Sequence, residues 1–278
     1  MENQELLEKL KREMRIRGFS QRTIKSYYLY NKHLLEFIKK NAQEVTEDDV
    51  KNYLDFLLTK KKVKKVTLNH VISALKFFYD GILGKTIFIK IKRPHREKTI
   101  PTILTKEEVK KMIDYTDNKK HKLLIKFAYA TGLRVSELVK LRVKHLDLKE
   151  GLVYVRRGKG SKDRVVPIPK ILVDELTEYL ISREGEHPYL FPGVKNKYLS
   201  VRSAEKIVNR ATKKARINKW VTVHTLRHSF ATHLLNDGVD IRFIQKLLGH
   251  KRLTSTEIYT HLTTENLKKI RNPLEDLW

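Results

Sequence analysis

The chain has 278 residues, enough for two ordinary domains or one large one. Hydrophobic residues make up 40% of it and charged residues 33%, a balance that excludes an intrinsically disordered chain. No apolar run approaches the roughly 20 residues that a membrane span requires, and the polar start Met1-Glu2-Asn3-Gln4-Glu5 is unlike a secretory signal. We expect a cytoplasmic protein with no membrane contact.

The excess of positive charge indicates the kind of partner. The 59 Lys and Arg residues outnumber 32 Asp and Glu, and the net charge of +27 attracts polyanions such as nucleic acids. A ribosomal-type charge and a lysine-rich thermophilic surface are alternatives, although thermophilic surfaces usually carry matching Glu. Charge alone specifies no base sequence and no reaction. The absence of cysteine excludes disulfides, thiol catalysis and Cys-ligated zinc.

Residues 1–89 are predicted to form a bundle of four helices. Apolar residues recur at helical spacing in four segments with short connections between them. Ser20 precedes the second helix, Thr46 is expected to cap the third, and Thr67 is expected to open the fourth. Leu58 is assigned to the buried face of the third helix. The pattern indicates a compact N-terminal helical domain.

Residues 90–103 read as a linker because they are basic, contain proline and show no apolar period. A solvated run of charge explains such a segment in the simplest way. A linker that follows a phosphate backbone is the sharper interpretation, and Lys90, Lys92 and Lys98 are then its contacts.

The second domain, residues 104–278, is predicted to be mostly helical with a small β-hairpin, an α+β arrangement. A capping box begins at Thr105, and a helix that includes residues 122–129 ends at a Thr-Gly pair. Residues 153–168 alternate in polarity around a glycine-rich turn, as in a hairpin. Helices dominate again after residue 171.

Two short segments offer cationic side chains beside glycine turns. Arg134 follows a glycine and precedes a short helix start, where a guanidinium can bind an anion. Lys159 lies between Gly158 and Gly160 in the hairpin turn, where small neighbours let a ligand approach closely. Alone, Arg134 is more often a surface ion pair, and the Lys159 segment lacks P-loop spacing.

Two later segments carry histidines and a tyrosine. His224 and Arg227 lie three residues apart on a predicted helix and can converge on one point. A zinc interpretation of His228 and His233 is disfavoured because the chain has no HExxH motif and no cysteine. Tyr259 alone would be read as a core or interface residue.

Together these segments resemble the tyrosine recombinase (phage integrase) family. The strings TGLRVSELVKL, GKGSKDRVVPIP, HTLRHSFATHLL and LLGHKRLTSTEIYTH are similar to those of Xer recombinases, the archaeal ones among them, from residue 105 to about residue 267. Six positions match the catalytic set of the family in order: Arg134, Lys159, His224, Arg227, His250 and Tyr259.

The resemblance implies a role for each cationic group. Arg134 and Arg227 would donate paired hydrogen bonds to the phosphate oxygens as negative charge gathers on them, without a metal. His250 would be a further donor to the phosphate, and Lys159 would protonate the departing 5′-oxygen.

The resemblance also implies how the nucleophile works. His224 would help to deprotonate Tyr259, whose ordinary pKa of about 10 makes it a poor nucleophile at neutral pH. The product would be a 3′-phosphotyrosine that keeps the bond energy, so rejoining needs neither ATP nor another cofactor.

The assembly implied by the family is a C-shaped clamp on a double-stranded DNA recombination site. Four protomers would join two sites and exchange one pair of strands at a time through a Holliday junction. The segment 264–278 would dock on a neighbouring protomer, or fold back on its own domain. A need for an accessory regulator stays open.

Rival interpretations differ in chemistry or in cellular role. A DNA-binding architectural protein would share the charge but cleave nothing, and a type IB topoisomerase would share the phosphotyrosine. Within recombinases, resolution of chromosome dimers is favoured over integration of a mobile element. The target DNA sequence cannot be read from the chain.

Overall fold

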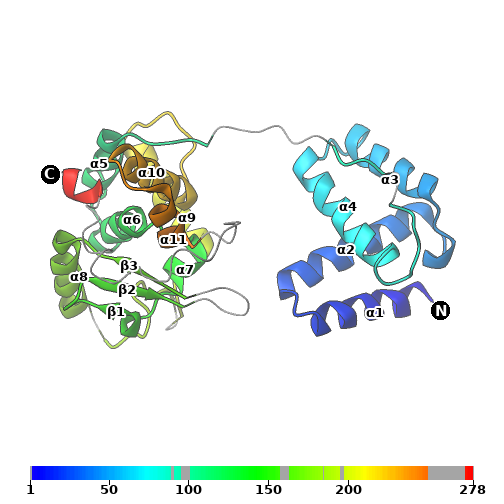
Figure 1. Cartoon of the computed structure of the whole chain (residues 1–278), viewed down its shortest axis with the longest axis horizontal. Helices are drawn as coiled ribbons and strands as arrows, with labels where there is room; N and C mark the ends of the chain where they lie inside the picture. The colour runs from blue at the N-terminus through cyan, green and yellow to red at the C-terminus, as the bar shows by residue number, and fades with distance from the viewer. Residues whose placement is uncertain are drawn as a thin grey trace. The chain divides into compact units, whose positions relative to one another are not determined.

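The chain forms two compact units, residues 1–99 and residues 100–278, in a computed structural model (Figure 1). The structure describes seven stretches of the chain, residues 2–88, 91–94, 101–156, 163–183, 185–194, 197–249 and 273–277. The predicted linker, residues 90–103, falls across the division between the units and is described only in part. Within the described residues, no helix combines the length and apolar character needed to cross a membrane.

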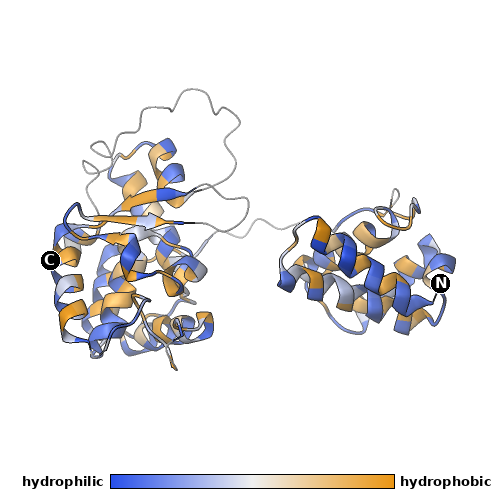
Figure 2. Ribbon diagram, turned by 90° about the horizontal axis from the view of Figure 1, so that it is seen from below, coloured by the Kyte–Doolittle hydropathy of each residue, from blue (hydrophilic) through white to orange (hydrophobic). Residues whose placement is uncertain are grey.

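The first unit is a bundle of helices, as the sequence predicts. Its elements are α1 (Asn3–Ile16), α2 (Gln21–Ile38), η1 (Ala42–Glu44), α3 (Glu47–Thr59) and α4 (Lys65–Tyr79). The predicted cap is present at Thr46, whose Oγ1 accepts from Asp49 N at 3.2 Å, and Ser20 also caps α2, since its Oγ accepts from Thr23 N at 3.1 Å. Each helix buries one apolar stripe, visible as alternating orange and blue faces in Figure 2.

Two predictions about this bundle are wrong in detail. α4 begins at Lys65 rather than at Thr67, and no side chain caps it. Leu68, Val71 and Leu75 lie on the buried side of α4, and the start at Lys65 places Leu68 in the first turn. The packing of these residues, rather than a capping side chain, therefore sets where α4 begins. Leu58 is exposed although it stands four residues after buried Leu54, because it lies in the last turn of α3, beyond the buried residues of that helix.

The second unit is mostly helical around a small sheet, which confirms the predicted fold class. Its helices are α5 (Lys106–Asp114), α6 (Lys119–Thr131), α7 (Val135–Val139), η2 (Val143–His145), α8 (Lys170–Ser182), α9 (Val201–Lys214), α10 (Val223–Asn236), α11 (Ile241–Leu248) and η3 (Pro273–Leu277). The predicted hairpin is β2 (Leu152–Val155) paired antiparallel with β3 (Arg164–Pro167), and a short β1 (Leu146–Asp147) extends it to the order β1-β2-β3.

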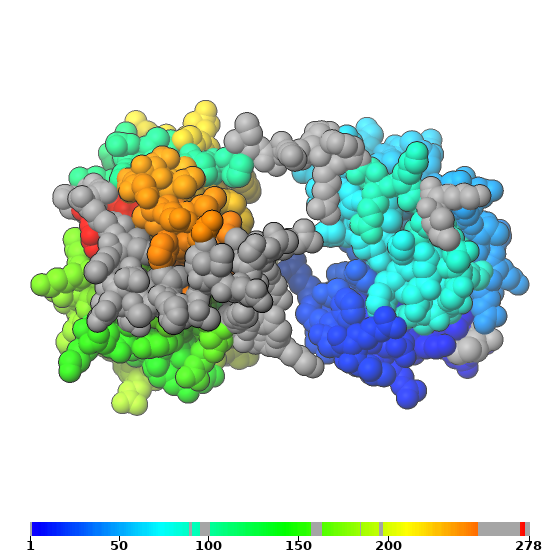
Figure 3. Space-filling model, in the orientation of Figure 1, coloured from blue at the N-terminus to red at the C-terminus, as the bar shows by residue number. Residues whose placement is uncertain are grey.

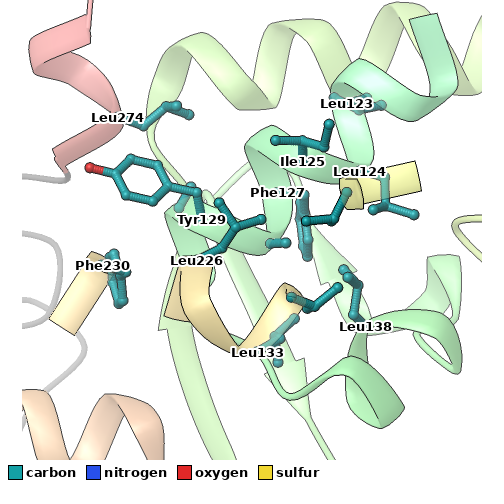
Figure 4. Close-up of a cluster of buried hydrophobic side chains, with 14 of the residues drawn as sticks. Leu123, Leu124, Ile125, Phe127, Tyr129, Leu133, Leu138, Leu226, Phe230 and Leu274 are labelled. Atoms are coloured by element: carbon teal, nitrogen blue, oxygen red, sulfur yellow. The ribbon is translucent and has the colours of Figure 1, made fainter. Parts of the chain in front are cut away.

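α6 and α10 form the centre of this unit and carry its largest buried side chains (Figure 4). Tyr129 of α6 packs edge-on against Phe230 of α10, and its hydroxyl lies 2.7 Å from Nδ1 of buried His233. The Thr105 capping box starts α5 as predicted, with Thr105 N donating to Glu108 Oε2 at 2.8 Å. The core therefore holds α10, which carries His224 and Arg227, against α6, which ends three residues before Arg134.

The C-terminal segment packs on its own chain. η3 contacts α5, α6 and α10, and Leu274 is fully buried beside Tyr129 (Figure 4). On the face drawn in Figure 3, the red surface of η3 lies close to the orange surface of α10 and α11. Of the two positions predicted for the tail, residues 273–277 of the single chain take the intramolecular one.

Gly132 ends α6 and allows α6, α10 and α11 to pack closely together at this point. Its backbone is left-handed, with φ of 57°, and its N–H closes the helix on the Ala128 carbonyl at 3.1 Å. A Cβ at this position would lie 2.7 Å from Phe230 on α10 and 2.9 Å from Leu248 on α11. Only glycine combines this backbone conformation with so close an approach.

Candidate active site

Arg134 projects from the N-terminal boundary of α7, immediately after the turn at Gly132. Its backbone is extended, with φ of −66° and ψ of 147°. The guanidinium reaches the end of α11, where Nη2 donates to the Gly249 carbonyl at 3.1 Å and Nη1 lies 3.4 Å from the Leu248 carbonyl. About a third of the side chain, 36%, stays exposed, so the group is anchored yet accessible to a ligand.

Arg227 reaches the same carbonyl from α10. Nη2 donates to Leu248 O at 2.7 Å and Nη1 to Gly132 O at 2.6 Å, and the residue is only 2% exposed. Burial, together with the positive charges of Arg134 and Arg164, lowers the pKa of Arg227 to about 10. The guanidinium still keeps its charge at neutral pH. The structure thus brings two of the predicted site residues together.

His224 lies one helical turn before Arg227, on the exposed side of α10. Its ring meets that of His228 edge-to-face, with the ring centroids 4.4 Å apart. Desolvation lowers the pKa of His224, and the positive charges of His228, Arg227 and Arg134 lower it further. The imidazole is therefore neutral at neutral pH and can accept a proton.

Two residues with no assigned role in the sequence analysis complete the described cluster. Glu137 of α7 accepts from Arg134 N at 2.9 Å and from Arg134 Nη1 at 3.1 Å. Arg164 of β3 forms a two-point pair with the same carboxylate, at 2.7 and 3.1 Å, and its Nε donates to the Leu247 carbonyl at 2.6 Å. Burial alone would raise the pKa of Glu137, but the bonds and charges of the two arginines outweigh it and hold that pKa below its ordinary value.

A sequence signal for both residues exists. Glu137 stands three residues after Arg134 at a helix start, the spacing of a capping-box acid. Arg164 and Val166 lie on the buried side of β3. Successive residues of a strand point to opposite sides, so an apolar residue is expected at position 164 as well as at 166. A charged residue at a buried strand position requires a partner, although the sequence does not say which one.

The end of α11 is the point on which the three guanidiniums converge. Arg164, Arg227 and Arg134 donate to the consecutive carbonyls of Leu247, Leu248 and Gly249. The C-terminal end of a helix carries a partial negative charge, which favours cations there. Among the described side chains of this cluster, Glu137 is the only carboxylate that offsets them. The surplus of positive charge suits an anionic ligand such as a phosphodiester.

The two histidines that the sequence favours as structural differ in their surroundings, since His233 is buried and His228 lies against the ring of His224. Burial lowers the pKa of His233, and its bond to Tyr129 ties α10 to α6. Over the stretches that the structure describes, no group of three or more His, Asp or Glu could hold a metal ion. Three predicted site residues, Lys159, His250 and Tyr259, lie outside the described residues.

Comparisons with known proteins cover both units. Residues 102–266 match the phage integrase family, and residues 6–89 match the phage integrase N-terminal SAM-like domain. The tyrosine recombinase XerA of Pyrococcus horikoshii is 39% identical over 96% of this chain and 92% of its own length.

Solved structures agree with this assignment. A crystal structure of XerA recombinase aligns with a TM-score of 0.53 and 35% identity, covering 96% of each chain. A lambda integrase tetramer bound to a Holliday junction aligns with a TM-score of 0.72, over 91% of this chain and 79% of that one. Its 19% identity shows a likeness of fold alone. The chain therefore belongs to the phage integrase family, as the sequence analysis predicts, and is a site-specific tyrosine recombinase of the Xer type.

Proposed function

We propose that Tyr259 is the nucleophile with which this recombinase cuts one strand at a double-stranded DNA recombination site. The observation that carries the proposal is the convergence of Arg134 and Arg227 on one carbonyl, that of Leu248, with His224 one turn away. Two fixed guanidiniums beside a neutral imidazole suit attack on a phosphodiester.

The two arginines act on the phosphate. Charge builds up on the non-bridging oxygens as phosphorus is attacked, and donors already in place stabilise it without reorganising. A guanidinium has five N–H donors, so two carbonyl bonds fix its plane without exhausting its capacity. His250 is proposed as a further donor, since the chain positions it directly after Gly249.

Proton transfers complete the cleavage step. The Tyr259 oxygen forms a bond to phosphorus while the bond from phosphorus to the 5′-oxygen breaks. His224 accepts the phenolic proton, and Lys159 supplies a proton to the departing 5′-oxygen. The 3′-phosphotyrosine keeps the energy of the broken ester, so attack by a second 5′-hydroxyl reverses the step. The scheme requires no ATP and no metal ion.

The proposed assembly is the one that membership of the family implies. We assign residues 1–89 to core DNA binding, 90–103 to a basic linker and 104–278 to catalysis, with both units closing on DNA as a clamp. Four protomers would act on two sites, and the tail, which packs on its own chain here, would exchange between protomers.

Neutralising Lys90, Lys92 and Lys98 should weaken DNA binding and flatten its salt dependence, whereas an unchanged salt slope would contradict the linker contact.

The cellular role we propose is resolution of chromosome dimers in the cytoplasm. Support comes from the Xer names of the relatives and from their similar length. Recombination restricted to a site on a mobile element would instead indicate an integrase.

Covalent trapping tests the proposed chemistry. A genomic DNA library incubated with the protein locates its site, and a nicked suicide duplex carrying that site should then yield a covalent protein–DNA adduct. Tyr259→Phe should abolish the adduct, while Tyr115→Phe, at an exposed tyrosine of the same unit, should leave its yield unchanged. A wild-type protein that binds DNA without any adduct would favour an architectural role. Relaxation of supercoils without site preference would favour a topoisomerase.

A further inference from the structure

Arg164 makes more contacts to the site than any role assigned so far explains. Its side chain is only 5% exposed, and it donates in two directions. Nη1 and Nη2 bind both oxygens of Glu137, and Nε binds the Leu247 carbonyl. A planar guanidinium that forms this fork has one orientation, which fixes the positions of its two partners relative to each other.

Both partners of Arg164 lead to Arg134. The Glu137 carboxylate that Arg164 holds also receives the backbone N–H and Nη1 of Arg134. The Leu247 carbonyl lies in the same helix end whose next two carbonyls receive the guanidinium of Arg134. Arg164 therefore closes a ring of contacts from β3 through α7 to α11 and back.

Stability alone is a weak reason for this arrangement. Removing charges from water costs several kcal/mol each, and well-packed apolar residues often replace a buried ion pair at no cost or with a gain. A preorganised site has a different requirement, because a displacement of about 1 Å can slow a reaction by about 100-fold. A buried fork that sets the plane of an exposed guanidinium meets that requirement.

We propose that Arg164 is a positioning residue that orients Arg134 through Glu137 and the end of α11. This role requires no contact between Arg164 and DNA or the reacting atoms. The inference rests on the proposed function, since Arg134 must bind the scissile phosphate for its orientation to matter. Because β3 begins five residues after Lys159 in the sequence, the same residue joins the strand that follows Lys159 to the arginine cluster.

The test uses the full chain and the nicked suicide duplex that carries its own site. Arg164→Met should lower the single-turnover rate of adduct formation by about 100-fold and change the Kd for the duplex far less. Arg183→Met is the matched control, because Arg183 also donates to two carbonyls, those of His187 and Tyr189, away from the site. It should lower the melting temperature and leave the cleavage rate unchanged.

A double-variant cycle separates positioning from general destabilisation. In an Arg134→Ala background, Arg164→Met should cause little further loss, because the group that it orients is gone. Loss by the same factor in both backgrounds, or wild-type cleavage by Arg164→Met, would overturn the inference. If Arg164→Met melts below the assay temperature, Arg164→Lys carries the same test, since it keeps the charge without the fork. A wild-type chain that forms no adduct refutes the proposed function itself.

Discussion

The two units of the chain bury different kinds of side chain. Among the described residues of the first unit, the buried polar side chains are those of Asn31 and Asn69, and the ion pairs lie at the surface. The second unit buries Lys126, Arg164 and Arg227 among its apolar residues. Both units have a continuous hydrophobic core, so the difference does not arise from a shortage of apolar residues.

The contrast shows where the second unit departs from what packing alone favours. A buried charge costs free energy unless bonds compensate for it, and Arg164 and Arg227 each use backbone carbonyls or a carboxylate for this purpose. The first unit contains no comparable described charge, which suits a domain that presents a surface rather than a reaction centre. Four predictions probe this contrast.

The largest effect is expected at Arg227. Arg227→Lys keeps the charge but loses the planar fork, so the rate of covalent adduct formation should fall by about 10²–10³-fold. The Kd for DNA should change less, because the lost contacts strengthen in the transition state. Single-turnover cleavage and equilibrium binding on the same duplex measure both values, and equal losses in the two would contradict the assignment.

Removing apolar volume should test the first unit separately. Leu34 is fully buried, and Leu34→Ala should cost about 2–5 kcal/mol of the unfolding free energy of that unit. Amide hydrogen exchange, read from the peptides of each unit, follows the two units separately. Peptides from residues 1–99 should exchange faster than in the wild type, while those from residues 100–278 keep their protection. An equal loss of protection in both units would show that they unfold together.

Acid should weaken the second unit through His233. Burial lowers its pKa below 6.5, so the folded unit binds this proton less readily than the unfolded chain does. The stabilisation that neutral His233 gives to the folded unit is therefore full above pH 6.5, and it is lost as the pH falls through the pKa of His233 in the folded state. Lys106, Asp237 and Glu107 add smaller and partly opposing effects. His233→Gln should flatten the pH dependence of the urea midpoint followed by circular dichroism, and an unaltered slope would exclude His233 as its source.

The smallest effect is expected at the surface of the first unit. Hydrogen bonds from Lys40 and Thr46 lower the pKa of Asp49 to about 2. This stabilisation is present above the ordinary value of 3.8 and is lost as the pH falls toward 2. Asp49→Asn should cost no more than about 1 kcal/mol at neutral pH, measured by urea unfolding. A larger loss would mean that the cap, rather than the ion pair, dominates.

The fold could be predicted where local signals and packing agree. Ser20, Thr46 and Thr105 start helices because their hydroxyls accept orphan N–H groups, which is a local property of the sequence. The start of α4 depends on which residues pack, and Lys64 offers no cap that could be read. Leu58 was misplaced because an apolar residue does not have to be buried.

The site could be predicted only in its linear parts. Arg134, His224 and Arg227 stand in recognisable strings, and the structure brings them to one place. The pair of Glu137 with Arg164 joins residues 27 positions apart through tertiary packing. Strand alternation could have marked Arg164 as buried, but only the fold supplies Leu247 and Glu137 as its partners. Positioning contacts of this kind depend on the meeting of elements rather than on any motif.

Gly132 has a consequence for engineering. Altering the target specificity of a recombinase usually begins with a library of variants, and position 132 looks like a harmless surface turn in the sequence. Any side chain there would separate α10 from α11, the elements that hold Arg227 and its carbonyl partner. In a library that varies this glycine, the variants at position 132 are expected to be inactive. One that fixes it keeps the cleavage centre intact while DNA-reading residues elsewhere change.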